Sequence, residues 1–476
     1  MNWEEEREAL EQEIKGLREA LAVAEQKIKE LTALVEQNSR NSNWSPSRDK
    51  SRSKRRNTSL RQKSGKKPGG QAGHVGQTLE MRENPDEIEV HRPSHCEHCQ
   101  RPFAENQRRV AVDRRQVHDL PPVRLIVQEH QAESLLCAVC GKLSRGEFPE
   151  DVTAPVQYGA GVQQLAVYLK TEQFIPYERS RQLFADLFGV KLSSGTLENS
   201  MERAARRVGP VVEQIKQALR RSQVGHFDES GFYIGGRRHW LHSAGTPSLT
   251  YYFAHPRRGC KATDAMDILP HFQGTAVHDA WSAYSQYRQC KHGLCNAHHL
   301  RELTAVVEND AQHWATLFKQ FLRSARQVVH DAQVAGQSTL SQPKLDQVER
   351  IYALLIDKGL RANPVPDGGW PKGSRGRVKK TKTRNLLERL DQRKGEVLAF
   401  VYDFCVPFDN NLAERDIRML KVQQKISGCF RSHSAAQDFC QIRSYISSLR
   451  KQGFNVWSAL RSLFSGDILL PDFIPV

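Results

Sequence analysis

Long apolar runs are absent from this sequence of 476 residues, which argues against a membrane-spanning segment. The chain begins with an acidic stretch rather than with the basic and apolar pattern of a signal peptide. Only 10 cysteines are present, too few in a chain of this length to indicate a disulfide scaffold. We therefore expect a soluble, cytoplasmic protein of roughly two to four domains.

Acidic residues are in deficit. The 54 Asp and Glu are outnumbered by 70 Lys and Arg, and the net charge of +16 favours a polyanionic partner and a location on the nucleoid. The excess is concentrated between Arg40 and Lys67, where 11 basic residues accompany one acid. Because residues 39–84 hold few apolar side chains, we expect a flexible basic arm. A solvated linker is the alternative, but the charge density favours contact with double-stranded DNA through Lys54, Arg55, Arg56, Lys66 and Lys67.

Residues 1–38 carry a heptad pattern. Their apolar residues alternate spacings of four and three, at Leu10, Ile14, Leu17, Leu21, Ala24, Ile28, Leu31 and Val35. This pattern predicts a coiled-coil helix, and therefore self-association. A single amphipathic helix packed on its own domain is the alternative.

Two CxxC pairs lie within residues 85–150. They consist of Cys96 with Cys99 and Cys137 with Cys140, and an extended segment lies between them. The spacing predicts a zinc ribbon with one Zn²⁺ held by four thiolates. Four thiolates leave no open coordination position, so we expect this zinc to be structural. The histidines nearby are interpreted as bystanders.

The middle of the chain changes from a helical to a strand pattern. Residues 151–221 are predicted to be helical, and Tyr177–Ala205 fits either a helix-turn-helix turned at Gly189 or plain helical packing. After them come short β-prone segments, at residues 224–228, 239–243, 249–253, 274–279 and 293–296. Three antiparallel strands, then helix, strand, helix and strand, is the order of a ribonuclease H-like sheet. Asp228 lies on the first of these strands and Asp279 ends the fourth, two places that are adjacent in that fold.

The stretch Val406–Arg418 carries the strongest chemical signal. Pro407 disfavours a helix before it, and an Asx residue just after Pro407 is a suitable helix cap. On the helix expected next, Glu414 shares a face with the amides of Asn410 and Asn411. Candidate DNA contacts surround it, namely Arg415, Arg418, Lys421, Lys425 and Arg431. This face suits a metal–phosphate site with the two amides in support, whereas a capped surface helix with solvated charges is the alternative.

Together these segments predict a multidomain α+β fold. A coiled-coil helix, a basic arm, a zinc ribbon and a helical region precede a ribonuclease H-like α/β catalytic core. The core is formed by residues 222–300 and 406–476, the second part including C-terminal helices. Residues 301–405 are expected to form a helical insertion between the two parts.

These motifs resemble the insertion sequence 66 family of bacterial DDE transposases over nearly the whole chain. The resemblance rests on Ser64–His74, the two CxxC pairs, His226–Ser230, His278–Tyr284, Leu294–His298 with Leu300–Leu303, Val406–Arg418 and Lys421–Ser432. At Ser230 the family more often has threonine, a difference of one methyl group.

The resemblance implies a transposase whose catalytic triad falls on Asp228, Asp279 and Glu414. Such an enzyme binds the element ends, cleaves to free a 3′-OH and joins that 3′-OH to target DNA, with accessory proteins encoded by the same element. Transfer of a DNA phosphodiester calls for two Mg²⁺ ions, which Mn²⁺ can replace. We expect Asp228 to bridge both ions and the other two carboxylates to hold one each.

Several neighbouring residues receive other interpretations. Glu229 should point to the opposite side of its strand and be structural, Asp409 should cap the helix, and Asp416 should form a salt bridge. The cluster of Cys290, His292, Cys295, His298 and His299 is interpreted as core and DNA-facing residues rather than as a second metal site. The rival functions are a catalytically inactive, domesticated transposase that only binds DNA, and a nuclease or resolvase that cuts without joining.

The N-terminal arm generates the first prediction. For duplex DNA, each phosphate that the protein neutralises makes the plot of log affinity against log salt concentration steeper by about 0.9. If half of the arm's cations contact phosphates, the slope should have a magnitude on the order of five per chain. Deleting residues 1–70 should flatten this slope and weaken self-association together. Salt-dependent DNA binding and sedimentation measure the two effects. A truncated protein with the slope and oligomer mass of the full chain would contradict both roles of the arm.

Overall fold

The computed structural model describes residues 3–38, 41–42, 73, 79–121, 123–365 and 380–474. It divides into a smaller unit, residues 51–126, and a larger unit, residues 1–50 with 127–476. The predicted DNA-contacting residues of the basic arm, Lys54, Arg55, Arg56, Lys66 and Lys67, lie outside the described residues.

The described part of the smaller unit is irregular chain held by local hydrogen bonds. The Gln116 side chain forms two hydrogen bonds with the backbone of Arg82, both at 2.7 Å. Its amide oxygen accepts from the Arg82 N–H, and its amide nitrogen donates to the Arg82 carbonyl. An isolated antiparallel bridge joins His95 to Pro102 across the first CxxC pair.

The larger unit begins with a long helix, α1 (Trp3–Val35), at the place where the heptad pattern predicts one. Its apolar seam is uncovered in the single chain. Ile14, Leu21 and Ile28 are 48%, 59% and 64% exposed. Pairing of this seam with a second chain stays a prediction.

Three helices precede the sheet: α2 (Ala160–Thr171), α3 (Tyr177–Phe188) and α4 (Ser194–Arg220). The predicted turn is confirmed, because Gly189 ends α3 in the left-handed conformation at φ 66° and the Ser193 side chain caps α4 by accepting from the Thr196 N–H. However, α4 is 27 residues long, and its C-terminal half is buried in the core cluster that includes Val212 and Ile215. The helices and turn are therefore established, while their use in DNA binding stays a prediction.

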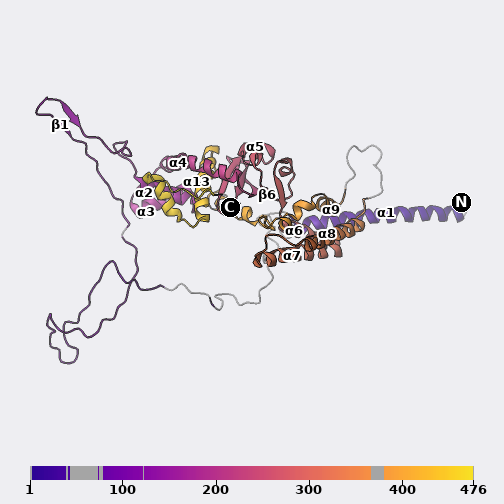
Figure 1. Ribbon diagram of the computed structural model, residues 1–476, viewed down its shortest axis with the longest axis horizontal. Helices are drawn as coiled ribbons and strands as arrows, with labels where there is room; N and C mark the ends of the chain where they lie inside the picture. Colours follow the sequence, from indigo (N-terminus) through magenta and orange to yellow (C-terminus); the bar gives the residue numbers. More distant parts are fainter. Residues whose placement is uncertain are drawn as a thin grey trace. The chain divides into compact units, whose positions relative to one another are not determined.

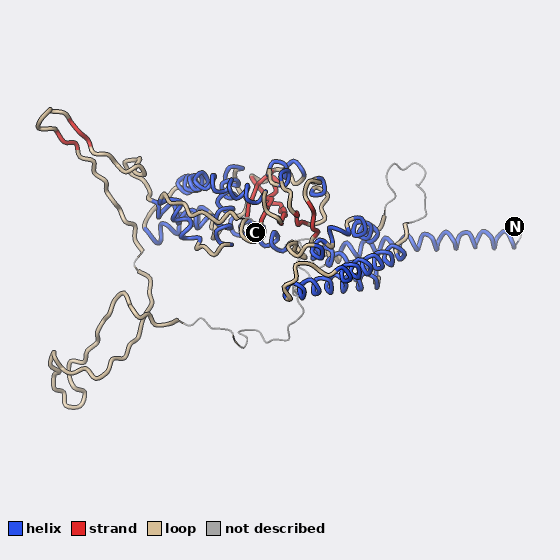
Figure 2. Tube along the Cα trace, viewed as in Figure 1, coloured by secondary structure: helices blue, strands red, loops and turns tan. Residues whose placement is uncertain are grey.

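Five strands form one mixed sheet in the order β5-β4-β3-β6-β7. The antiparallel strands are β3 (Val224–Ile234), β4 (Arg237–Gly245) and β5 (Thr250–His255). Two further strands, β6 (Thr275–His278) and β7 (Lys291–Leu294), run parallel to β3. All five predicted strands are present, although β7 lies two residues earlier than expected. Figure 2 shows these strands flanked by helices.

The β3–β4 hairpin is longer than its sequence pattern indicates. Gly235 and Gly236 turn the chain at φ 52° and 78°, which suits the two-residue turn that matches strand twist. Pairing then extends from Ile234↔Arg237 to His226↔Gly245. The strand that carries Asp228 is therefore paired with β4 from His226 to its end at Ile234.

Alternate residues of the sheet face two different cores. Phe227 on β3 packs with α4 in one cluster, whereas Phe232 and Ile234 pack with Ile417 and Leu420 in another. The last two belong to α12 (Asn411–Ser427). Since side chains alternate along a strand, every even-numbered residue of β3 lies on the α12 side.

Between β7 and α12 the chain is helical, and the first helix begins at Asn296 rather than at the predicted residue 301; Figure 1 shows these helices as a group. These are α6 (Asn296–Asp310), α7 (His313–Val334), α8 (Gln342–Ala362), α9 (Lys382–Gln392), α10 (Lys394–Val397) and α11 (Ala399–Tyr402). They share a core of their own around Phe318, Tyr352 and Leu387. The insertion therefore packs largely on itself.

The remaining elements are short or terminal. The predicted helix at 262–271 splits into α5 (Cys260–Met266) and a 3₁₀ turn at Leu269–His271, and the one expected at 280–287 is a single 3₁₀ turn at Tyr284–Gln286. Two helices close the chain, α13 (His433–Lys451) and α14 (Val456–Ser465). Within the described residues, every helix is too short or too polar to span a bilayer.

Candidate active site

Asp228 and Asp279 occupy matching places on neighbouring parallel strands. The last paired residues of β3 and β6 are His226 and Val277, and each aspartate follows its paired residue by two positions. Adjacent strands lie about 4.8 Å apart, and equal offsets in register keep the two side chains on one face. The sequence prediction that these carboxylates are neighbours therefore agrees with the sheet register.

Glu414 reaches the same face from the first turn of α12. Asn410 occupies the cap position of this helix, but its side chain does not cap it. Instead its amide oxygen accepts from His226 Nδ1 at 2.8 Å, and its amide nitrogen donates to the Phe227 carbonyl at 2.8 Å. The cap hydrogen bond comes from Asp409, which accepts from the Asn411 N–H at 3.1 Å. Asn410, which is 2% exposed, thus fastens α12 to β3 one residue from Asp228.

Asp228 is affected by the charges of the neighbouring carboxylates. Burial raises the pKa of Asp228 well above its usual range, and the charges of Glu229, Asp279 and Glu414 raise it further. The backbone N–H of Glu229, which donates to Asp228 Oδ1 at 2.8 Å, opposes this shift. The site therefore holds more negative charge than its surroundings neutralise, and a bound cation would relieve it.

Glu229 has partners of its own on the other face of β3. Its carboxylate accepts from Arg258 Nε at 2.8 Å and from the Tyr284 hydroxyl at 2.5 Å, and its side chain is 2% exposed. The Arg258 guanidinium also lies over the Trp281 ring, 4.2 Å from its centroid. These contacts agree with the structural role expected for Glu229, although burial and the charge of Asp279 raise its pKa as well.

The end of β6 is fixed by a histidine next to Asp279. His278 is fully buried, donates from Nδ1 to the Asp279 carbonyl, and meets His292 Nδ1 with its Nε2 at 2.9 Å. Burial lowers the pKa of His278 to about 3, so it is neutral. The Asp279 carboxylate itself accepts from the Trp281 N–H at 2.9 Å.

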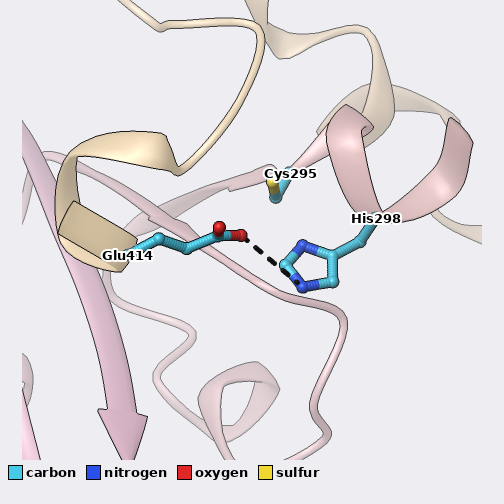
Figure 3. Close-up of side chains that lie close together, drawn as sticks. All are labelled: Cys295, His298 and Glu414. Atoms are coloured by element: carbon cyan, nitrogen blue, oxygen red, sulfur yellow. Dashed lines mark ion pairs between the residues drawn. The ribbon is translucent and has the colours of Figure 1, made fainter. Parts of the chain in front are cut away.

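Two residues of α6 contact Glu414 and were not anticipated as its partners. His298 Nε2 is 3.8 Å from Glu414 Oε1, and Arg301 Nη2 is 3.7 Å from Glu414 Oε2. Figure 3 shows His298 and Cys295 facing the Glu414 carboxylate from the start of α6. Cys295, His298 and Arg301 are spaced by three residues, which places them on one helical face. This spacing is the sequence feature that could have predicted a shared contact.

The predicted cluster of cysteines and histidines does not form a single group. Cys290 and His292 lie beside Tyr287 and His278, and His299 is buried with a contact to Asn296. Cys295, 1% exposed, instead accepts from the Asn410 N–H at 3.1 Å. Burial raises the pKa of its thiol to about 12.

The basic residues on α12 and just after it divide into exposed residues and one that is engaged in packing. Arg415, Arg418, Lys425 and Arg431 are exposed and are free to meet a polyanion. Lys421 donates to the Gly231 carbonyl at 2.7 Å, so it contributes to the packing of α12 on β3. The expected salt bridge of Asp416 is confirmed, with Lys451 Nζ at 2.6 Å.

Each CxxC pair folds into the same turn. Cys96 and Cys137 each donate from the backbone N–H to the carbonyl five residues later, at 2.9 Å, and each accepts from the N–H four residues later, at 2.9 Å. Backbone N–H groups of Cys99 and His98 lower the pKa of Cys96, and those of Cys140 and Val139 lower that of Cys137. Both turns therefore favour the thiolate, which is the form that binds a metal.

Comparison with known proteins gives two family matches. A family described as Transposase IS66 family matches residues 155–438, which is more than half of the chain. A Family of unknown function (DUF6444) matches residues 2–80. No curated protein matches the chain.

The amide bridge of Asn410 yields a stability prediction. Asn410→Ala should lower the free energy of unfolding by about 3 kcal/mol, because it leaves His226 Nδ1 and the Phe227 carbonyl buried without partners. The exposed neighbour Asn411 is the matched control, and Asn411→Ala should cost no more than about 0.5 kcal/mol. Urea unfolding followed by circular dichroism measures both. Equal midpoints for the two variants would show that the bridge does not hold α12.

Proposed function

Because the chain belongs to the IS66 family of transposases, we propose that it cleaves and joins DNA through Asp228, Asp279 and Glu414. Membership of the family makes it a transposase, and a transposase acts on DNA. The proposal concerns the finer step, namely which residues transfer the phosphodiester and with what help.

The observation that carries the proposal is the meeting of two strands and one helix. Asp228 and Asp279 have the same offset from paired residues of parallel strands, and α12 brings Glu414 to the same side of the sheet. The strand order with β3 at the centre is the order expected for a ribonuclease H-like sheet. Glu414 follows Asp279 by 135 positions, and the helices α6 to α11 occupy most of the chain between them.

The residues present fit a hard divalent cation. Three carboxylates supply oxygen ligands of the kind that Mg²⁺ prefers, and Glu414 Oε1 is buried without a hydrogen-bond partner among the described residues. Two Mg²⁺ ions, or Mn²⁺ in their place, would activate the attacking oxygen and stabilise the leaving 3′ oxygen when bound. Asp228, which feels the charge of both other carboxylates, is suited to the bridging position.

The protein groups around the carboxylates have distinct tasks in this scheme. Asn410 sets the distance between α12 and β3, and Arg301 steadies the second oxygen of Glu414. The exposed Arg415 and Arg418 would lie against DNA phosphates. Hydrolysis first frees a 3′-OH at the element end, and that 3′-OH then attacks the target DNA in the same site. No covalent bond to the enzyme is required.

The N-terminal segments would organise the DNA and the complex. The exposed seam of α1 is proposed to pair with a second chain, and the basic arm that follows it to lie along the duplex. The two CxxC turns are proposed to share one structural Zn²⁺ through Cys96, Cys99, Cys137 and Cys140. Accessory proteins of the same element are further proposed partners.

The triad is tested by substitution. Asp228→Asn, Asp279→Asn and Glu414→Gln should each abolish Mg²⁺-dependent cleavage and joining of DNA that carries the element ends, while DNA binding persists. Asp409→Asn is the control, since it keeps the cap acceptor and lies outside the triad. A triad variant with near wild-type cleavage would overturn its assignment. Wild-type protein that binds the ends without cleaving would favour the inactive, domesticated alternative, and cutting without joining would favour a nuclease or resolvase.

A second readout of Asp228 needs no DNA. Since folding raises its pKa, the folded chain holds this proton to higher pH than the unfolded chain does. Metal-free protein therefore loses stability as pH rises above the ordinary pKa of an aspartate. Asp228→Asn removes this loss and should raise the melting temperature at neutral pH in a chelator. A lower melting temperature for this variant would show that the carboxylate is not under electrostatic strain.

The zinc proposal is tested by metal analysis. Purified protein should hold one tightly bound zinc per chain, and Cys96→Ser should lower the zinc content while leaving the sheet domain folded. Cys405→Ser changes an exposed cysteine elsewhere and should have no effect on zinc. Unchanged zinc in the Cys96 variant would exclude the four-thiolate site.

A further inference from the structure

Three potential metal ligands of different chemistry meet beside the carboxylate cluster. Cys295, His298 and Glu414 each offer one ligand atom, and these atoms lie within 4.8 Å of one another. They come from the end of β7, the first turn of α6 and the first turn of α12, as Figure 3 shows. The connection between β7 and α6 thus meets α12, which lies more than 100 residues later in the sequence.

The polar atoms at this point are left unsatisfied. Glu414 Oε1 and His298 Nδ1 are both buried and have no hydrogen-bond partner among the described residues. The other His298 nitrogen is 3.8 Å from Glu414 Oε1, which is longer than a hydrogen bond. Arg301 faces Oε2, so it leaves Oε1 open. Buried polar groups are normally paired, and a bound ion would pair these.

The donor set selects a class of ion. A thiolate, an imidazole and a carboxylate together suit Zn²⁺ and similar transition metals, whereas Mg²⁺ takes oxygen ligands. Tetrahedral Zn²⁺ would need its ligand atoms roughly 3.3–3.6 Å apart. The atoms here, which lie within 4.8 Å of one another, would have to approach by about 1.5 Å at most, which side-chain rotation allows. Three protein ligands would leave a fourth position for water.

We propose that Cys295, His298 and Glu414 form an inhibitory site for Zn²⁺ or a similar transition metal. The proposal rests on the proposed catalytic role of Glu414. An ion held by Cys295 and His298 turns the Glu414 carboxylate toward α6, away from Asp228 and Asp279, and repels a second cation there. One carboxylate is thereby shared between an active and an inhibited arrangement, and the free concentration of the transition metal sets the balance.

Binding is tested without any DNA. Protein whose four-thiolate site is already filled with zinc is titrated with Co²⁺, and thiolate coordination is followed by its near-ultraviolet charge-transfer absorption. Wild-type protein should develop this band, and Cys295→Ala should not. Cys290→Ala, which removes another buried cysteine outside the trio, is the matched control and should keep the band. A band of equal strength in the Cys295 variant, or none in the wild type, would overturn the proposal. Cys295→Ser, closer in volume, serves if the alanine variant does not fold.

Inhibition is tested in the DNA cleavage assay with Mg²⁺ held constant. Added Zn²⁺ should inhibit the wild type, and Cys295→Ala should raise the inhibitory Zn²⁺ concentration by at least about tenfold, with each protein compared with its own rate of cleavage in Mg²⁺ alone. Equal zinc sensitivity in the two proteins would refute the inhibitory role. If the wild type shows the cobalt band but never cleaves DNA, the proposed function fails while the metal site stands. The two failures are therefore distinguishable.

Discussion

The two hydrogen bonds of Asn410 hold the candidate site together. They join the helix that carries Glu414 to the strand that carries Asp228, and both are made in a buried setting where an unpaired partner would be costly. The Asn410 backbone N–H also donates to Cys295, so the same residue ties α12 to the end of β7. Three segments that are distant in sequence therefore meet at one side chain and its backbone, and the position of each carboxylate depends on this junction.

The two faces of β3 treat neighbouring carboxylates in opposite ways. Glu229 is neutralised by Arg258 and receives a hydrogen bond from Tyr284. Asp228, one residue earlier, accepts from the backbone N–H of Glu229, and the charges of three other carboxylates raise its pKa. The fold thus pairs Glu229 with a cationic side chain, whereas Asp228 is surrounded by other carboxylates. Carboxylates with strongly raised pKa values are typical of functional sites, where charge repulsion lowers the stability of the fold.

Patterns that act over a few residues predicted the fold well. The alternation of the strands, the glycine turn after Phe188 and the start of a helix near Asn410 all follow from local rules. Side-chain contacts between residues that are distant in sequence could not be predicted from these local rules. The sequence suggested that Asp409 caps the helix and that Asn410 supports Glu414, but it did not reveal that the Asn410 side chain spans to β3. Lys421 looks like a DNA contact but donates to the Gly231 carbonyl. Residue type and spacing cannot reveal a partner that lies 190 residues away.

The helical segment between β7 and α12 enters and leaves the sheet domain at almost the same place. The Asn296 N–H at its start donates to the Phe408 carbonyl at its end, at 3.1 Å, so the length of the insertion does not affect where Glu414 lies. Its core is largely its own, built around residues such as Phe318 and Tyr352. Yet its first helix delivers His298 and Arg301 to Glu414. The insertion is therefore more than a spacer, because any movement of α6 relative to α12 would change the contacts of Glu414 with His298 and Arg301.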